Sequence, residues 1–331
     1  MYFRQNRPFL SDALLVQLLS LTLPFFILVG LGYASRRLGW LPKDGVRSIN
    51  VFVFYFAVPA LTINALAKQQ FQTLVDLPYL AGWALAGILL YAIGAAIAWK
   101  FFDGQPQEMA LFGQAASVGN LGFLALPLLI VVVGEEVAAP IAAALVVDLV
   151  LIIPLSIAII ESANSTGKGF VEAFAASCRG AILNPFFLAI TTGVTISALG
   201  LELALPIERF ISFLAGAAGP AALFSLGASL AGRSIAGDAA AIAWLNLLKL
   251  LVHPILAFFI LTWFGVEGLF LQIGVVIAAM PIAGNVFVIA QNYGLMVRRL
   301  SAAILISTVA AVVTVALTLQ FMGLAQERLT V

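Results

Sequence analysis

Apolar residues fill most of the chain in runs that are each long enough to cross a lipid bilayer. A membrane-spanning helix needs about 20 predominantly apolar residues, at a rise of about 1.5 Å per residue. Measured against that length, the sequence predicts an all-α polytopic membrane protein with ten spans and short connections. The predicted spans are 14–34, 46–67, 77–101, 108–133, 138–161, 181–200, 206–231, 239–264, 268–293 and 300–322.

Two of these runs contain residues that a lipid-facing helix does not need. Each has a Gly-Asn pair and a proline, within ASVGNLGFLALPLL (116–129) and MPIAGNVFVIAQNYG (280–294). Proline removes a backbone donor and clashes with the preceding turn. We therefore predict that the fourth and ninth helices are broken, with the proline in each holding the break open. The residues are Gly119, Asn120 and Pro127 in the first segment, and Pro281, Gly284 and Asn285 in the second.

The chain also repeats itself at an offset of 161 residues. Pro24-Phe25-Phe26 matches Pro185-Phe186-Phe187, and Gly32 matches Gly193. Pro59-Ala60 matches Pro220-Ala221 at the same offset. Residues 1–165 and 166–331 would then be two five-helix repeats. Because five is odd, the second repeat must enter the membrane inverted, and inverted repeats with broken helices are typical of secondary transporters.

Composition strengthens the membrane assignment and excludes other classes. Hydrophobic residues make up 63% of the 331 residues and charged residues only 9%, against about 25% charged in soluble domains. The net charge of +1 and the lack of a basic cluster argue against nucleic acid as a partner. Cys178 and His253 are each the sole residue of their type. We therefore expect no disulfide, no metal site, no cofactor, no catalytic residues and no enzymatic activity.

Lysine and arginine predict the orientation, because cytoplasmic loops carry an excess of them. Ten lie in the odd-numbered loops, five lie in the termini and even-numbered loops, and Lys249 lies within a span. This distribution places both termini outside a bacterial plasma membrane (inner membrane). The ten are Arg36, Arg37, Lys43, Arg47, Lys100, Lys168, Arg179, Arg233, Arg298 and Arg299, and the five are Arg4, Arg7, Lys68, Arg209 and Arg328.

Five segments together resemble the auxin efflux carrier family, which includes plant auxin exporters and bacterial malonate-type carriers. They are PFFILVGLGYASRRLGWLP (24–42), FAVPAL (56–61), GNLGFLALPLL (119–129), LFSLGASLAG (223–232) and MPIAGNVFVIAQNYG (280–294). The resemblance implies an architecture like that of sodium/proton antiporters and bile acid symporters. Helices 1, 2, 6 and 7 would form a dimerising scaffold, and helices 3–5 and 8–10 a transport domain in which helices 4 and 9 cross. The chain resembles the short bacterial form.

Polar residues near the two breaks are the candidate substrate ligands. Asn120 and Asn285 either contact substrate or cap freed backbone groups at the breaks. Gly119 and Gly284 adjoin them, and Ser117 precedes Asn120 by three residues. Asn64 and Ser225 each follow a proline by five residues, as a symmetric polar pair would. The Glu135-Glu136 pair is predicted to be a solvated loop.

Three ionisable residues inside predicted spans are candidates for charge or coupling roles. Lys249 either attracts an anion or offers a proton site, or it offsets the partial negative charge of half-helix carboxyl ends. Asp148 either carries a coupling proton or forms an ion pair with Lys249. His253 lies four residues after Lys249 and is either functional or a packed, hydrogen-bonded histidine.

These patterns favour a secondary active transporter of a small organic anion, a mono- or dicarboxylate, working by alternating access where helices 4 and 9 cross. Half-helix amino ends favour carboxylates. Two alternatives stay open: a sodium-coupled organic-anion symporter of the bile acid carrier type, and a membrane ligand sensor or channel that does not act as a transporter. The candidate coupling ions are a proton and a sodium ion, transport without a coupling ion also stays open, the lipid bilayer surrounds the protein, and the expected assembly is a homodimer.

Overall fold

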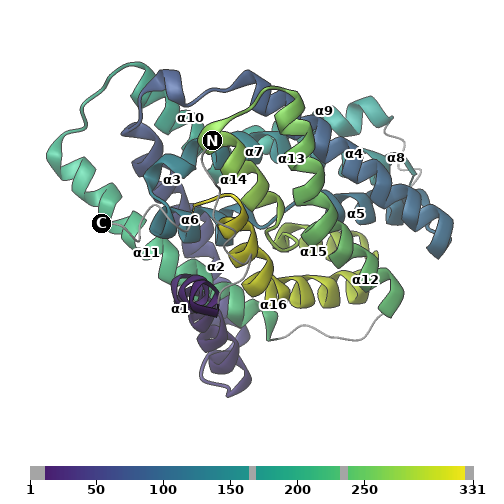
Figure 1. Ribbon diagram of the computed structural model, residues 1–331. Helices are drawn as coiled ribbons and strands as arrows, with labels where there is room; N and C mark the ends of the chain where they lie inside the picture. Colours follow the sequence, from purple (N-terminus) through teal and green to yellow (C-terminus); the bar gives the residue numbers. More distant parts are fainter. Residues whose placement is uncertain (1–11, 164–168, 232–237, 325–331) are drawn as a thin grey trace, which may run out of the picture.

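A computed structural model describes residues 12–163, 169–231 and 238–324 (Figure 1). Within these residues the secondary structure is helical, with one isolated bridge between two extended residues. The α-helices are α1 (Asp12–Arg37), α2 (Lys43–Phe52), α3 (Val58–Ala67), α4 (Leu77–Phe102), α5 (Pro106–Ser117), α6 (Leu126–Val132), α7 (Ala138–Val147), α8 (Ile153–Ala163), α9 (Phe170–Ile182), α10 (Pro185–Ala198), α11 (Leu205–Leu230), α12 (Ala239–Leu247), α13 (His253–Trp263), α14 (Gly268–Ala278), α15 (Gly284–Tyr293) and α16 (Val297–Phe321).

The all-helical membrane class is confirmed, whereas the count of ten spans is not. Among the described residues, six helical segments are long and apolar enough to cross a bilayer, or seven if α9 and α10, bent by 58°, form one span. The six are Lys43–Ala67, Phe71–Phe102, Glu135–Ala163, Leu205–Leu230, Ala239–Trp263 and Val297–Phe321. The predicted spans 108–133 and 268–293 are each divided into shorter helices. Ten spans therefore remain a prediction.

Proline explains an irregularity that recurs in four helical segments, three of which are among the six long ones. Each described π-helical turn ends two residues before a proline: η1 (Val53–Ala57), η3 (Leu121–Ala125), η5 (Asp148–Ile152) and η6 (Leu248–Val252) precede Pro59, Pro127, Pro154 and Pro254. A proline ring clashes with the carbonyl four residues before it in an α-helix. The wider turn relieves that clash while the helix continues.

Two groups of helices lie beside each other in Figure 1. In one, α1 packs along α11, and α3 packs against both α10 and α11. In the other, α4 packs against α5 and α13, α8 against α5, and α12 against α16. The first broken segment touches the first group, because η3 and α6 contact α11.

Close backbone approach fixes two helix pairs in the first group. A Cβ on Gly32 of α1 would overlap the Phe224 carbonyl of α11. A Cβ on Gly193 of α10 would lie 2.9 Å from Leu66 Cβ of α3 and 3.4 Å from Ile63 Cα. Gly32 and Gly193 are separated by the same 161 residues as Ile63 and Phe224. The two contacts therefore correspond at the offset that the sequence repeat predicts.

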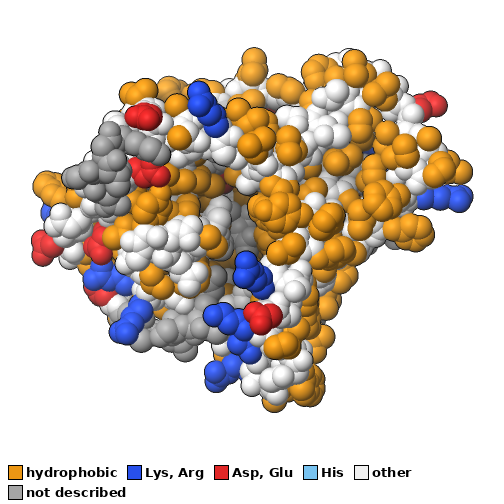
Figure 2. Space-filling model, turned by 180° about the vertical axis from the view of Figure 1, so that it is seen from behind, with side chains coloured by type: hydrophobic (Ala, Val, Ile, Leu, Met, Phe, Trp, Pro, Cys, Tyr) orange, Lys and Arg blue, Asp and Glu red, His pale blue; other side chains and the backbone are white. Residues whose placement is uncertain are grey.

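The surface is apolar over broad areas, as expected of a bilayer protein. Figure 2 shows hydrophobic side chains covering much of one face, with charged side chains along its edges and in its lower middle part. Phe213 and Trp263 are among the exposed large hydrophobic residues, at 82% and 77%. The predicted orientation rests partly on Arg4, Arg7, Lys168, Arg233 and Arg328, which lie outside the described residues, as do the two chain ends.

Candidate functional site

The two broken segments meet and pair through their backbones. Residues 118–120 follow α5 and residues 279–283 follow α14, and both stretches are non-helical. We call these two stretches the crossing. Gly119 and Ile282 form an antiparallel bridge. The Asn120 N–H donates to the Pro281 carbonyl at 2.9 Å, and the Ala283 N–H donates to the Val118 carbonyl at 3.2 Å.

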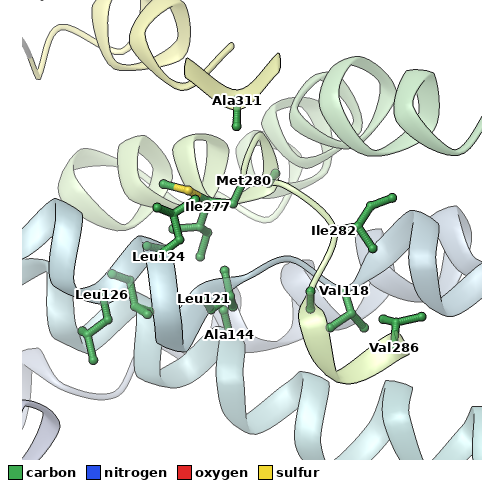
Figure 3. Packing of buried hydrophobic residues seen from close by; sticks show 14 of the residues in the cluster. Val118, Leu121, Leu124, Leu126, Ala144, Ile277, Met280, Ile282, Val286 and Ala311 are labelled. Carbon is green, nitrogen blue, oxygen red and sulfur yellow. The ribbon is translucent and has the colours of Figure 1, made fainter. Parts of the chain in front are cut away.

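This pairing solves the main physical problem of a broken helix in hydrocarbon. Helix ends leave backbone donors and acceptors without partners, and lipid supplies none. Here backbone N–H groups freed at each break donate to backbone carbonyls of the other break. Apolar side chains seal the crossing, and Figure 3 shows Val118, Leu121, Ile277, Met280 and Ile282 gathered around it.

The two prolines have different positions. Pro281 lies within the crossing, as predicted, and its carbonyl accepts the Asn120 N–H. Pro127 lies in the first turn of α6, separated from the break by η3. The prediction that Pro127 itself holds the break open is therefore wrong in position: Pro127 follows the π-helical turn, and the helix begins again before it.

The two asparagines have different environments. Asn120 is 6% exposed, and its side chain forms no hydrogen bond among the described residues. Asn285 is exposed in the first turn of α15. Neither side chain caps a helix end, since η3 and α15 begin without a side-chain capping bond. Both amides are therefore unengaged by the described part of the chain.

Three of the polar residues predicted near the substrate have other partners. The Ser117 hydroxyl is buried and donates to the Gly113 carbonyl of its own helix at 2.9 Å. Asn64 donates to Glu135 Oε1 at 3.4 Å. It also lines a separate pocket of about 300 Å³ with Lys68, Glu202 and other residues, none of them from the crossing. Ser225 bonds within α11 to the Ala222 carbonyl.

Lys249 reaches the crossing from η6. Its side chain is fully buried. The ammonium donates to the Ala278 carbonyl, at the last residue of α14, at 2.9 Å, and lies 2.8 Å from His253 Nδ1. A Cβ on Gly119 would lie 3.1 Å from Lys249 Nζ. In this conformation the ammonium therefore sits on the carboxyl end of a half-helix, which matches the dipole-compensating alternative.

Asp148 lies near Lys249 but does not form a direct ion pair with it. The three ion pairs within 4.0 Å among the described residues involve other side chains. Asp148 is 4% exposed and accepts a hydrogen bond from Trp83, while its Oδ2 has no partner in the described structure. The ring of Trp83 lies 5.4 Å from that of His253. These four side chains form a buried polar group beside the crossing.

Glu135 and Glu136 lie in an exposed turn, as the sequence predicts, with 44% of the Glu135 side chain exposed, but Glu135 also makes contacts that were not predicted. Its carboxylate lies 3.6 Å from Lys68 Nζ and accepts from Asn64, and its carbonyl accepts from Gln69 Nε2 at 2.9 Å. Glu135 begins the turn η4 (Glu135–Val137) before α7, whereas its partners are in and just after α3. Two adjacent acidic residues after a glycine carry no sequence signal for such a contact.

Comparisons with known proteins agree with a transport role. The family model described as "Membrane transport protein" matches residues 18–319. A "Putative malonate transporter" of Rhizobium meliloti (strain 1021) is 31% identical, over 91% of this chain and 94% of that protein. The "Uncharacterized transporter YfdV" of Escherichia coli (strain K12) is 23% identical, over 88% and 93%. An "Uncharacterized transporter" of Methanothermobacter thermautotrophicus is 26% identical, over 89% and 95%.

Proposed function

Because the chain belongs to the membrane transport protein family, the auxin efflux carrier family, we propose that it is a secondary active carrier of a small organic anion. The observation that carries the proposal is the crossing, where two helix breaks pair through the Gly119–Ile282 bridge. Crossed, broken helices are typical of secondary transporters, which bind substrate where the breaks meet. The name of the malonate relative favours a dicarboxylate.

The proposed binding groups are the amides of Asn120 and Asn285. Asn120 is at the first break, and Asn285 is in the first turn of α15 after the second. Amide N–H groups donate to carboxylate oxygens, and the amino end of α15 adds partial positive charge. Neither amide has a partner in the described part of the chain, so both are available to a ligand.

We assign the helices to an inverted repeat with a scaffold of α1–α3, α10 and α11. The other helices from α4 to α8 and from α12 to α16 then form the transport domain. The matched contacts of Gly32 with Phe224 and of Gly193 with Ile63 support this assignment, because both pairs lie in the proposed scaffold and are related by the repeat offset.

Alternating access requires the transport domain and the scaffold to separate on one side of the membrane at a time. The contacts of Glu135 with Asn64, Lys68 and Gln69 join η4 to the end of α3, and so link transport domain to scaffold on the predicted outer side. On α15, Asn285 and Val288 are exposed, Val288 at 53%. This combination supports a conformation that is closed at Glu135 and open along α15.

Counterflow in proteoliposomes tests the proposal. Vesicles loaded with unlabelled malonate or another mono- or dicarboxylate should accumulate the labelled acid only when they contain the protein. Asn120→Ala and Asn285→Ala should each slow exchange roughly tenfold or more, since a hydrogen bond to a charged group contributes about 1.5–3 kcal/mol. Asn292→Ala, an exposed asparagine on the same helix as Asn285, is the matched control. Absence of exchange for every acid tested would refute the carrier assignment.

A further inference from the structure

Five side chains form a buried polar cluster that touches the crossing. We call it the ionisable cluster: Tyr79 and Trp83 of α4, Asp148 of η5, Lys249 of η6 and His253 of α13. Asp148, at 4%, is the most exposed of them. Trp83 holds the cluster together, because it bonds to Asp148 and lies 6.1 Å from the Tyr79 ring and 5.4 Å from the His253 ring.

The cluster leaves polar atoms without partners. In the described structure the Tyr79 hydroxyl, Asp148 Oδ2 and His253 Nε2 are buried and form no hydrogen bond. Buried polar groups in proteins are normally paired, since an unpaired one is unfavourable by about 1–3 kcal/mol. Three such atoms in one cluster indicate a site that exchanges a small polar occupant, with Asp148 as its only carboxylate.

The contacts of Lys249 decide which occupant fits. Its ammonium is bonded to the Ala278 carbonyl and to His253 Nδ1, so Asp148 Oδ2 receives no direct cation. An ionised carboxylate without a direct partner is costly to bury, and a proton on Oδ2 removes that charge. A sodium ion would need several oxygen ligands, as hard cations do, and the Ala278 carbonyl at the end of α14 is already taken by the ammonium.

Three buried or half-buried titratable groups on helices packed against η5 have partners of their own, whereas Glu172 and Arg179 of α9 are exposed. Tyr91 of α4 pairs with Ser156 of α8 at 3.3 Å. Cys178 of α9 contacts the Val150 carbonyl at 3.5 Å. At the far end of α8, Glu161 accepts from Tyr293 of α15 at 3.0 Å. Among the described residues of this region, Asp148 is thus the buried carboxylate whose second oxygen has no partner.

We propose that Asp148 carries the coupling proton, so that the anion moves together with a proton and not with a sodium ion. A proton from water on one side binds Oδ2, crosses with the transport domain and returns to water on the other side, while Lys249 keeps its own protons. Lys249 links this site to the crossing, since it donates to the Ala278 carbonyl and lies where a Cβ on Gly119 would approach it to 3.1 Å. This inference rests on the proposed carrier function.

Proton-driven uptake by reconstituted protein tests the inference separately from the carrier function. With one proton per anion, a gradient of one pH unit supports about tenfold accumulation of labelled malonate. Wild type should respond to the gradient equally in sodium and choline buffer. Asp148→Asn should lose the response yet keep counterflow, and Asp148→Glu should keep both. Glu172→Gln, an exposed carboxylate on α9, is the matched control, and protein-free vesicles measure diffusion of the protonated acid.

The remaining outcomes of these uptake and counterflow experiments refute either the proton-coupling inference or the carrier function. A gradient response retained by Asp148→Asn would overturn the inference, and so would uptake that requires sodium. Loss of counterflow in Asp148→Asn would also overturn it, because Asp148 would then serve substrate binding or folding. Absence of counterflow in wild type would instead refute the carrier function itself.

Discussion

Gly119 and Gly284 occupy equivalent places in the two Gly-Asn motifs, but the structure predicts opposite responses to alanine. A Cβ on Gly119 would lie 3.1 Å from Lys249 Nζ and 3.3 Å from the Ile277 carbonyl oxygen, and both distances are shorter than the ordinary contact range of 3.4–4 Å. A Cβ on Gly284 would meet nothing within 4 Å. We therefore expect Gly119→Ala to impair the protein and Gly284→Ala to be tolerated.

The size of the destabilisation expected for Gly119→Ala follows from which atoms the added methyl group would displace. The Ile277 oxygen belongs to the backbone of α14, and Lys249 Nζ is held by Ala278 and His253. Overpacking a well-packed site is unfavourable by about 1–3 kcal/mol, and losing one hydrogen bond to a charged group by about 1.5–3 kcal/mol. Either route destabilises Gly119→Ala by roughly 2 kcal/mol, which lowers a melting temperature by about 4–8 °C at roughly 2–4 °C per kcal/mol.

The assay is the thermal unfolding midpoint of purified protein in detergent, paired with malonate counterflow for each variant. Gly216→Ala on α11, where an added Cβ also meets nothing within 4 Å, controls for the substitution itself. An unchanged midpoint and exchange rate for Gly119→Ala, or greater damage from Gly284→Ala, would refute the packing of Lys249 against the crossing.

Two further predictions concern the contacts that hold the proposed conformation. Glu135→Ala removes the bonds to Asn64 and Lys68, so the equilibrium should shift toward the outward-open conformation by roughly 5–30-fold for a change of 1–2 kcal/mol. Labelling of an Asn285→Cys probe in a Cys178→Ser background should then slow, since the probe is exposed in the other conformation. Glu136→Ala is the control, and an equal labelling rate would contradict the closure role. Ser307→Ala leaves the Ile282 N–H without its acceptor, which should lower the free energy of unfolding by about 1–3 kcal/mol. Ser301→Ala on the same helix should leave it unchanged. Equal thermal unfolding midpoints for the two variants would contradict a stabilising role of the Ser307 bond.

The sequence was sufficient for the membrane class and for locating both breaks. Long apolar runs with few charges have no other stable solution than membrane helices, and Gly-Asn within such a run marks irregular backbone. The sequence was not sufficient to predict which residues of the two breaks pair with each other. The motifs align Gly119 with Gly284, but in the structure Gly119 pairs with Ile282, because the bridge depends on how α5 and α14 approach each other. That approach is set by packing across the whole bundle.

Proline was misread for a related reason. A proline in a helix relieves its clash either by a break or by a wider turn. At Pro59, Pro127, Pro154 and Pro254 the structure has the wider turn, and the sequence contains nothing that decides between the two. The contacts of Lys249 with Ala278 and of Glu135 with Lys68 and Asn64 could not be predicted from the sequence either, since these partners belong to segments distant in the chain. Their identities follow only from the three-dimensional arrangement.

Counterflow of labelled malonate by the double variant Asn120→Ala/Asn285→Ala tests the central claim, that the anion binds at the crossing. We predict that the double variant, folded as judged by its unfolding midpoint, exchanges malonate at least tenfold more slowly than wild type, while Asn292→Ala exchanges at the wild-type rate. Wild-type exchange by the double variant would show that the anion binds elsewhere and would contradict the account.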